Sequence, residues 1–180
     1  MARAHGFTLI EVMIAVFILG IGLLGVAGLQ SVSSSMNQQS YMRSQATLLA
    51  DDIADRMRAN PLGVDNGDYD MGAAATPTLD TNCNTTSGCG TTAMAQHDLQ
   101  QWVDTVDEKL PAPPAADTPA DRAVVCIDGP PRDDGAPASP DCDGTGNTYV
   151  IKIWWLDKAG DTSAGSPHGD TERFVTELRP

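Results

Sequence analysis

Apolar side chains fill residues 7–29 almost without a break, and the one charged residue in this stretch is Glu11. A helix over these residues is roughly 34 Å long, which is enough to cross the hydrocarbon core of a bilayer. An ionisable side chain at the centre of such a helix costs on the order of 2.5–3.5 kcal/mol, so it usually has a function and a partner. The pattern therefore predicts a membrane-spanning helix in which Glu11 has a role of its own.

The helical pattern continues past residue 29, although the chain becomes polar there. From Ala46 onwards, apolar residues recur at spacings of three and four and share one face. They are Ala46, Leu49, Ala50, Ile53 and Met57. Asp52 and Arg56 lie on the other side and are spaced for an i,i+4 ion pair. Because Pro61 disfavours helix in the residue before it, the pattern predicts one helix over residues 7–59.

A second amphipathic helix is predicted over residues 93–110, with Thr91 or Thr92 as its cap and Pro111 at its end. Its apolar face carries Ala95, Leu99, Trp102, Val103, Val106 and Leu110. His97 lies one position off this face. The flanking segments, residues 61–90 and 111–119, are rich in turn-forming residues and are predicted to be loop and irregular linker.

Three strand-like runs follow, at residues 122–128, 147–157 and 171–178. The second run alternates strongly between two faces. One face carries Tyr149, Ile151, Ile153 and Trp155, and the other carries Val150, Lys152, Trp154 and Leu156. Because adjacent strand residues point to opposite faces, we expect one of Trp154 and Trp155 in the core and the other on the sheet surface. An antiparallel sheet on the inner face of the long helix is the arrangement we predict.

The charge of the chain narrows the choice of partners. The formal net charge is −13, and loss of residues 1–6, which contain Arg3, would make it −14. Such a balance disfavours binding to phosphate backbones, so we predict no nucleic-acid partner. The sequence also has no Gly-x-Ser-x-Gly, no metal-spaced histidine pair and no phosphate loop, and beyond residues 1–6 its imidazoles are His97 and His168. We therefore expect neither an enzyme nor a cofactor.

The four cysteines fit an oxidising compartment and permit three pairings. Sequential pairing, Cys83 with Cys89 and Cys126 with Cys142, is favoured because each bridge closes a segment that cannot build a core of its own. A zinc site would need cysteines with two to four residues between them or nearby histidines, and the sequence offers neither. We therefore predict disulfides, with the connectivity left open.

The segment 141–146 resembles the opening of an EF-hand loop, with oxygen-bearing side chains at its first, third and fifth positions and glycine at its sixth. The twelfth position is Lys152, where that loop needs a bidentate glutamate. No metal site is assigned for this reason. A looser calcium site built from Asp133, Asp134, Asp141 and Asp143 stays open beside the favoured interpretation, a solvated acidic turn.

The start of the chain carries a resemblance to a known family. Residues 6–11 read Gly-Phe-Thr-Leu-Ile-Glu, and Gly6 stands before the apolar run, whereas a secretory signal has its cleavage site after it. This order resembles the class III leader of type IV pilins and type II secretion pseudopilins. The resemblance implies cleavage by prepilin peptidase between Gly6 and Phe7, N-methylation of Phe7 and an assembly charge at Glu11. The alternative is a plain signal anchor in which Glu11 lies near the headgroups.

The same resemblance implies an α+β fold, a lollipop in which a long N-terminal helix packs on a small antiparallel β-sheet head with disulfide-stapled loops. Residues 1–6 would be the leader, 7–29 the transmembrane and assembly half of the helix, 30–60 its amphipathic half, and 61–180 the periplasmic head. The positive-inside tendency leaves Arg3 in the cytoplasm. The chain is then a single-pass inner-membrane protein before assembly and part of an extracellular pilus afterwards.

Residues 50–60, ADDIADRMRAN, are similar to the stretch that follows the helix in one subgroup of minor pilins, the type IV pilus modification proteins. The resemblance implies a minor pilin that primes pilus assembly at or near the fibre tip and supports twitching motility and adhesion. Its implied partners are other minor pilins, the major pilin, prepilin peptidase and the inner-membrane assembly platform. The alternatives are a type II secretion minor pseudopilin, a tip adhesin or surface sensor, and a signal-anchored periplasmic enzyme.

Overall fold

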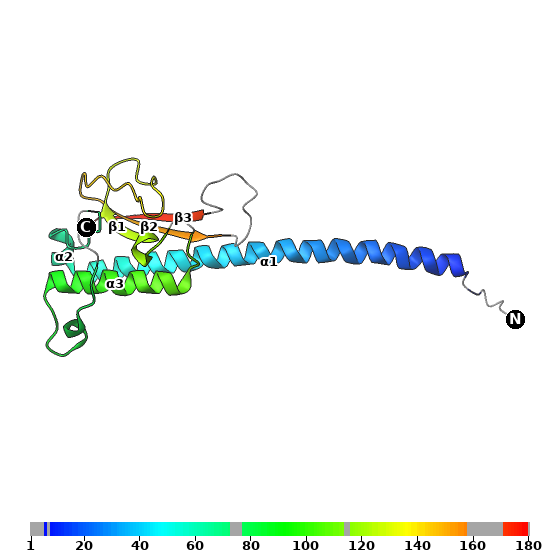
Figure 1. The fold of residues 1–180 in the computed structure, drawn as a ribbon, viewed down its shortest axis with the longest axis horizontal. Helices are drawn as coiled ribbons and strands as arrows, with labels where there is room; N and C mark the ends of the chain where they lie inside the picture. Colours follow the sequence, from blue (N-terminus) through cyan, green and yellow to red (C-terminus); the bar gives the residue numbers. More distant parts are fainter. Residues whose placement is uncertain (1–5, 7, 73–76, 114–115, 158–170, 180) are drawn as a thin grey trace. The chain divides into compact units, whose positions relative to one another are not determined.

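The computed structural model describes residues 6, 8–72, 77–113, 116–157 and 171–179. In chain order the elements are α1 (Leu9–Ala59), α2 (Pro61–Asp65), η1 (Thr81–Asn84), α3 (Thr91–Lys109), η2 (Pro119–Asp121), β1 (Ala123–Ile127), β2 (Tyr149–Leu156) and β3 (Thr171–Leu178) (Figure 1). The chain divides into two compact units, residues 1–41 and 42–180. Helix α1 contributes to both units.

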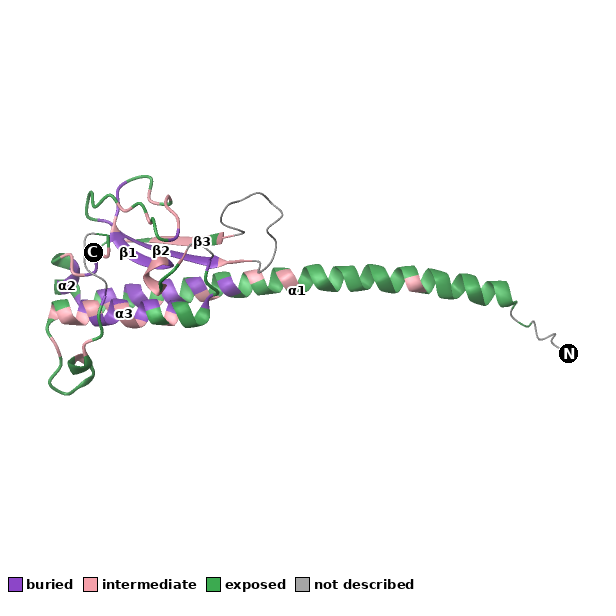
Figure 2. Ribbon diagram, viewed as in Figure 1, coloured by how far each residue is buried: buried purple, intermediate pink, exposed green. Residues whose placement is uncertain are grey.

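In the first unit, α1 exposes its apolar side chains along most of its length (Figure 2). Phe17 is 70% exposed and Leu24 is 75% exposed. The helix has a mean hydropathy of 2.7 over 18 residues, so by length and composition it could cross a membrane. The predicted N-terminal apolar helix is therefore confirmed.

In the second unit, α1 buries the face that its spacing predicts. Ala46, Leu49, Ala50, Ile53 and Met57 are all buried there. On the other side Arg56 Nε lies 3.1 Å from Asp52 Oδ2, which confirms the predicted ion pair. The indole nitrogen of Trp102 on α3 donates a 2.8 Å hydrogen bond to the backbone oxygen of Leu49, which ties the two helices together. Helix α1 ends at Ala59, as the Asn60-Pro61 pair predicts.

The loop predicted over residues 61–90 is wrong in two places, where α2 and η1 form instead. The side chain of Asn60 caps α2 by accepting a 3.3 Å hydrogen bond from the amide of Gly63. Pro61 suits the first helical position, where an amide hydrogen has no partner within the helix. Asp80 caps η1 in the same way, through a 2.9 Å bond from the amide of Asn82. Each cap depends on one side chain and one amide two or three residues later, and the composition of the segment does not reveal it.

Helix α3 buries the predicted apolar face but begins differently from the prediction. Its N-cap is Gly90, without a side-chain hydrogen bond, so the predicted threonine cap is wrong. The hydroxyl of Thr92 instead donates to Asp68 Oδ2 at 3.0 Å. His97, expected just off the apolar face, is buried, and its Nδ1 accepts a 3.2 Å hydrogen bond from the amide of Asp80.

The described strands form one antiparallel sheet in the order β1-β2-β3. Ile153 on β2 lies opposite Ala123 on β1 and Phe174 on β3. The inner face of β2 packs with α1 and α3 in one hydrophobic core, and it consists of Tyr149, Ile151, Ile153 and Trp155, as predicted. The predicted α+β fold, a long N-terminal helix with a small antiparallel sheet and disulfide-stapled loops, is confirmed.

The outer face of the sheet is covered as well, which strand alternation does not predict. Residues 128–148, which connect β1 to β2, lie over this face (Figure 1), and we call them the β1–β2 loop. Beneath this loop Val124, Cys126 and Trp154 form a second, smaller core. Trp154 and Trp155 are each 2% exposed, so the expectation that one of them lies on the surface is wrong.

Candidate functional site

The predicted processing and assembly residues lie at the start of α1. Gly6 is exposed and precedes the helix, whereas Phe7 lies outside the described residues. The amide of Glu11 donates to the hydroxyl of Thr8 at 3.3 Å and to its backbone oxygen at 3.2 Å, so Thr8 caps the helix. Glu11 is exposed in the first turn, where the helix dipole favours a carboxylate.

This arrangement combines one carboxylate with a long apolar surface. Between Gly6 and Arg43 the chain carries no charged residue besides Glu11. An exposed apolar surface of this size is suited to lipid or to other apolar helices. In either setting a carboxylate is unfavourable unless a cationic group pairs with it.

Both cysteine pairs are joined in sequential order, Cys83 with Cys89 and Cys126 with Cys142. These are the pairings that the spacing favours. The first bridge connects η1 to the turn that precedes α3. The second connects β1 to the β1–β2 loop, and its Cys126 is fully buried on the outer face of the sheet.

Ionic and polar contacts hold the β1–β2 loop at further points. The ammonium of Lys152, on β2, is enclosed by oxygens of the loop. On β3, the guanidinium of Arg173 donates to the backbone oxygen of Gly135 at 3.0 Å. The guanidinium of Arg132, in the loop, lies 3.4 Å from Glu177 on β3. The loop is therefore attached to β1, β2 and β3.

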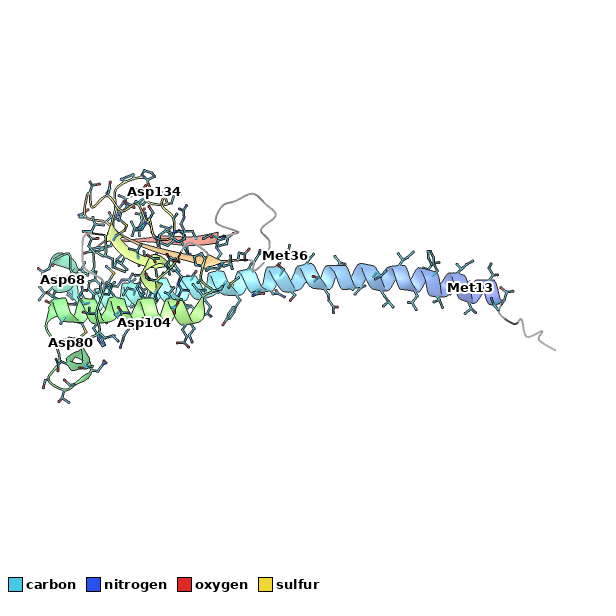
Figure 3. The ribbon with its side chains drawn as sticks, in the orientation of Figure 1. Met13, Met36, Asp68, Asp80, Asp104 and Asp134 are labelled. Carbon is cyan, nitrogen blue, oxygen red and sulfur yellow. A yellow bond between two sulfur atoms is a disulfide. The ribbon has the colours of Figure 1, made fainter. Side chains whose placement is uncertain are left out.

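The four aspartates considered for calcium do not gather around one point. Asp134, labelled in Figure 3, lies 3.2 Å from the Lys152 ammonium. Asp143 accepts hydrogen bonds from the hydroxyl and amide of Thr145 and from the amide of Gly129, and these lower the pKa of its carboxyl group. Within the described ranges no group of three or more His, Cys, Asp or Glu side chains is placed to hold a metal ion. The looser calcium site is therefore wrong.

The closest partner of the Lys152 ammonium is Asp128, a residue that the sequence pattern did not single out. Asp128 directly follows β1 and is only 2% exposed. A polar residue at the end of a buried strand is a weak signal, because such residues are usually solvated. Of the two histidines considered for catalysis, His168 lies outside the described residues, and Nε2 of His97 is buried without a hydrogen-bond partner among the residues that the structure describes.

Two family models match adjacent parts of the chain. Residues 1–27 match the prokaryotic N-terminal methylation motif, and residues 28–100 match the family described as type IV pilin Tt1218. Together the two matches cover residues 1–100. No curated protein and no solved structure matches this chain.

Type IV pilins are structural subunits, and the type IV pilin family is not an enzyme family. The methylation motif together with the pilin match implies prepilin peptidase and pilus partners in general. The exposed apolar helix of this chain fits a membrane-anchored pilin that ends up in the pilus.

Proposed function

We propose that this chain is a pilin, a minor subunit of a type IV pilus, which primes assembly at or near the fibre tip and supports twitching motility and adhesion. The observation that carries the proposal is the exposed apolar part of α1 with Glu11 in its first turn. The apolar surface stores the subunit in the inner membrane, with the head in the periplasm. Extraction into a helical bundle then covers the same surface with neighbouring subunits.

The role proposed for Glu11 follows from its charge. After cleavage at Gly6, Phe7 becomes the methylated amino terminus of the mature chain, and Glu11 is the fifth residue of that chain. Removing one partner of a buried ion pair costs about 3–5 kcal/mol, so a carboxylate inside the bundle must find a cation. The methylated terminus of Phe7 in the adjoining subunit is the cation that we propose. Pairing of the two charges then selects the correct vertical register between subunits.

Three variants test this proposal in pilus-forming cells. Glu11→Ala and Glu11→Gln remove the charge and are expected to insert and to be cleaved at Gly6, yet to enter sheared pili poorly. Glu11→Asp keeps the charge and is expected to retain part of the incorporation. Immunoblots of membranes and of sheared pili measure both steps. Normal incorporation of Glu11→Ala would rule out the pairing.

Residues 50–60 support the assignment to the type IV pilus modification proteins, the PilV subgroup of minor pilins, over the second candidate, a type II secretion minor pseudopilin. The structure places this segment at the end of α1, where Ala50, Ile53 and Met57 are buried in the head. A chromosomal neighbourhood of pilus assembly genes would support the pilus assignment. A neighbourhood of secretion genes would transfer the chain to the pseudopilins.

A direct adhesive role is a separate candidate, favoured by the β1–β2 loop and its exposed acidic residues Asp133 and Asp141. Deletion of residues 127–141 is a poor test, because it would uncover Trp154. Asp133→Ala with Asp141→Gly changes the exposed rim while the contacts of the Lys152 ammonium remain. Normal piliation with lost attachment would favour adhesion, whereas normal attachment would leave priming of assembly as the function.

A further inference from the structure

The Lys152 side chain is fully buried on the outer face of β2, and oxygens surround its ammonium. The nitrogen Nζ lies 2.7 Å from Asp128 Oδ2 and 3.2 Å from Asp134 Oδ1. It also lies 2.8 Å from the backbone oxygen of Pro140 and 3.3 Å from that of Asp134. We call these four oxygens the cation cage. Every one of them belongs to the β1–β2 loop, whereas the ammonium comes from the sheet.

Burial of an ammonium is costly unless its hydrogens and its charge are both satisfied. Lysine has three N–H donors, and the cage offers four acceptors. The two carboxylates oppose the single positive charge, and the side chain of Asp128 is itself only 2% exposed. The two carboxylates carry two negative charges and the ammonium carries one positive charge. The cage with its ammonium therefore has a net charge of −1.

The oxygen types in the cage are those that hard divalent cations prefer. Calcium binds six to eight oxygens drawn from carboxylates, backbone carbonyls and water. Gly135 helps to bring these groups together, since its φ is 86° and a Cβ atom there would collide with the backbone oxygen of Pro140. The segment 128–140 thus brings carboxylate and carbonyl oxygens together around one positive charge, the Lys152 ammonium.

We propose that the β1–β2 loop forms a cation site and that Lys152 is its resident cation. The proposal does not depend on the function proposed for the pilin. The loop keeps its conformation over the sheet without any metal, because the positive charge is covalently part of β2. Removal of the Lys152 side chain leaves two carboxylates and two carbonyl oxygens around a space that calcium and its waters fill.

The test compares thermal unfolding of the full chain in detergent micelles, with EDTA and with millimolar calcium chloride. The midpoint of the wild type is expected to be the same in both conditions. Lys152→Ser is expected to unfold at a lower temperature in EDTA and to recover with calcium, since a ligand that binds only the folded state stabilises it. Titration calorimetry should show one calcium ion bound to Lys152→Ser and none to the wild type.

Two further variants control the experiment. Lys109→Ser removes an exposed lysine that pairs with Glu108, and it should show no calcium response. Lys152→Ser with Asp134→Asn removes one cage carboxylate, and it should lose most of the calcium binding. Lys152→Gln provides a second neutral variant if the serine variant does not fold in EDTA.

Three results would overturn the proposal. The first is a calcium or EDTA effect on the midpoint of the wild type. The second is a folded Lys152→Ser that binds no calcium. The third is that neither Lys152→Ser nor Lys152→Gln shows a cooperative unfolding transition when calcium is added.

Discussion

The hydroxyl of Tyr69 donates a 2.7 Å hydrogen bond to Asp98 Oδ2, and both residues are buried. The other oxygen of Asp98 lies 3.5 Å from the guanidinium of Arg56. Burial, and then the hydrogen bond to Asp98, raise the pKa of Tyr69 well above its usual value. This relationship joins the end of α1, the segment after α2 and the helix α3 through one carboxylate.

Tyr69→Phe is expected to destabilise the head by about 1.5–3 kcal/mol, the usual range for a hydrogen bond to a charged group. Asp98→Asn should cost a similar amount, because it also weakens the pair with Arg56. The double variant should cost less than the sum of the two, since both substitutions weaken the same hydrogen bond. Urea unfolding of the full chain in detergent, followed by the fluorescence of the buried tryptophans, measures all three. Additive costs would show that Tyr69 and Asp98 are not coupled.

Asn60→Ala should lower the free energy of unfolding by more than a substitution in a turn usually does. The side-chain amide of Asn60 donates to the backbone oxygen of Thr91 at 2.9 Å, while its oxygen caps α2. Alanine removes the cap, worth about 1 kcal/mol, and leaves a partly buried carbonyl without its donor, which costs about 1–3 kcal/mol more.

The same urea titration measures Asn60→Ala. Asn66→Ala, at an exposed position just after α2, is the matched control and should change the free energy of unfolding by less than about 0.5 kcal/mol. Equal effects of the two substitutions would contradict the role assigned to Asn60.

The head should lose stability at alkaline pH through Tyr149. Burial raises the pKa of its hydroxyl to about 12, and nearby carboxylates, Asp70 first among them, add to the effect. Above pH 10 an unfolded tyrosine loses its proton while the folded one keeps it. The unfolded state then binds fewer protons, so the free energy of unfolding falls as the pH rises from about 10 towards 12. The contribution that is lost is on the order of 2–3 kcal/mol.

Tyr149→Phe should make this decline less steep between pH 10 and 12, and the remaining decline comes from Tyr69, whose pKa is raised as well. At neutral pH the variant loses about 1 kcal/mol, because the 2.9 Å bond from the hydroxyl to the backbone oxygen of Val64 disappears. Tyr41→Phe, which changes an exposed tyrosine, should leave the alkaline profile as it is. Chemical unfolding at a series of pH values measures both variants, and an unchanged profile in Tyr149→Phe would contradict the assignment.

The two disulfides should contribute unequally to the free energy of unfolding. The bonded cysteines are 16 residues apart in the Cys126–Cys142 pair and 6 apart in the Cys83–Cys89 pair. On the chain-entropy model the longer loop gains about 3 kcal/mol and the shorter about 2 kcal/mol. Loss of the Cys126–Cys142 pair also loosens the cover over Trp154. We therefore expect the larger loss of stability from removing this pair. Paired alanine variants compared by urea unfolding test this order, and a larger cost for the shorter loop would reverse it.

Much of the fold could be predicted from local sequence. The apolar run around Glu11 and the stripe from Ala46 to Met57 predict α1, because helical periodicity is a property of neighbouring residues. Pro61 ends that helix because a proline disfavours helical conformation in the residue before it, here Asn60. β3 begins and ends at the predicted residues, and β1 and β2 differ from their predicted ranges by at most two residues at either end. The leader motif at Gly6 is likewise a contiguous signal, and its match to the methylation motif covers residues 1–27.

The errors concern long-range contacts. The strand pattern predicts that only one of Trp154 and Trp155 lies in the core. Trp154 is buried as well because the β1–β2 loop folds back over the sheet and Cys142 packs against this outer core. His97 is buried because the segment before η1 packs on it through Asp80. In each case the deciding partner is distant in sequence and leaves no periodic signal.

The sequence by itself determined the exposed apolar helix with one carboxylate, the α+β succession and the cysteine spacing, all of which depend on residues close together along the chain. Only the tertiary structure decided that the outer face of the sheet is covered and that Lys152 is enclosed by Asp128 and Asp134. These partners precede Lys152 by 24 and 18 residues. Lysine is ordinarily solvated, so its burial becomes favourable only when folding brings both carboxylates to it.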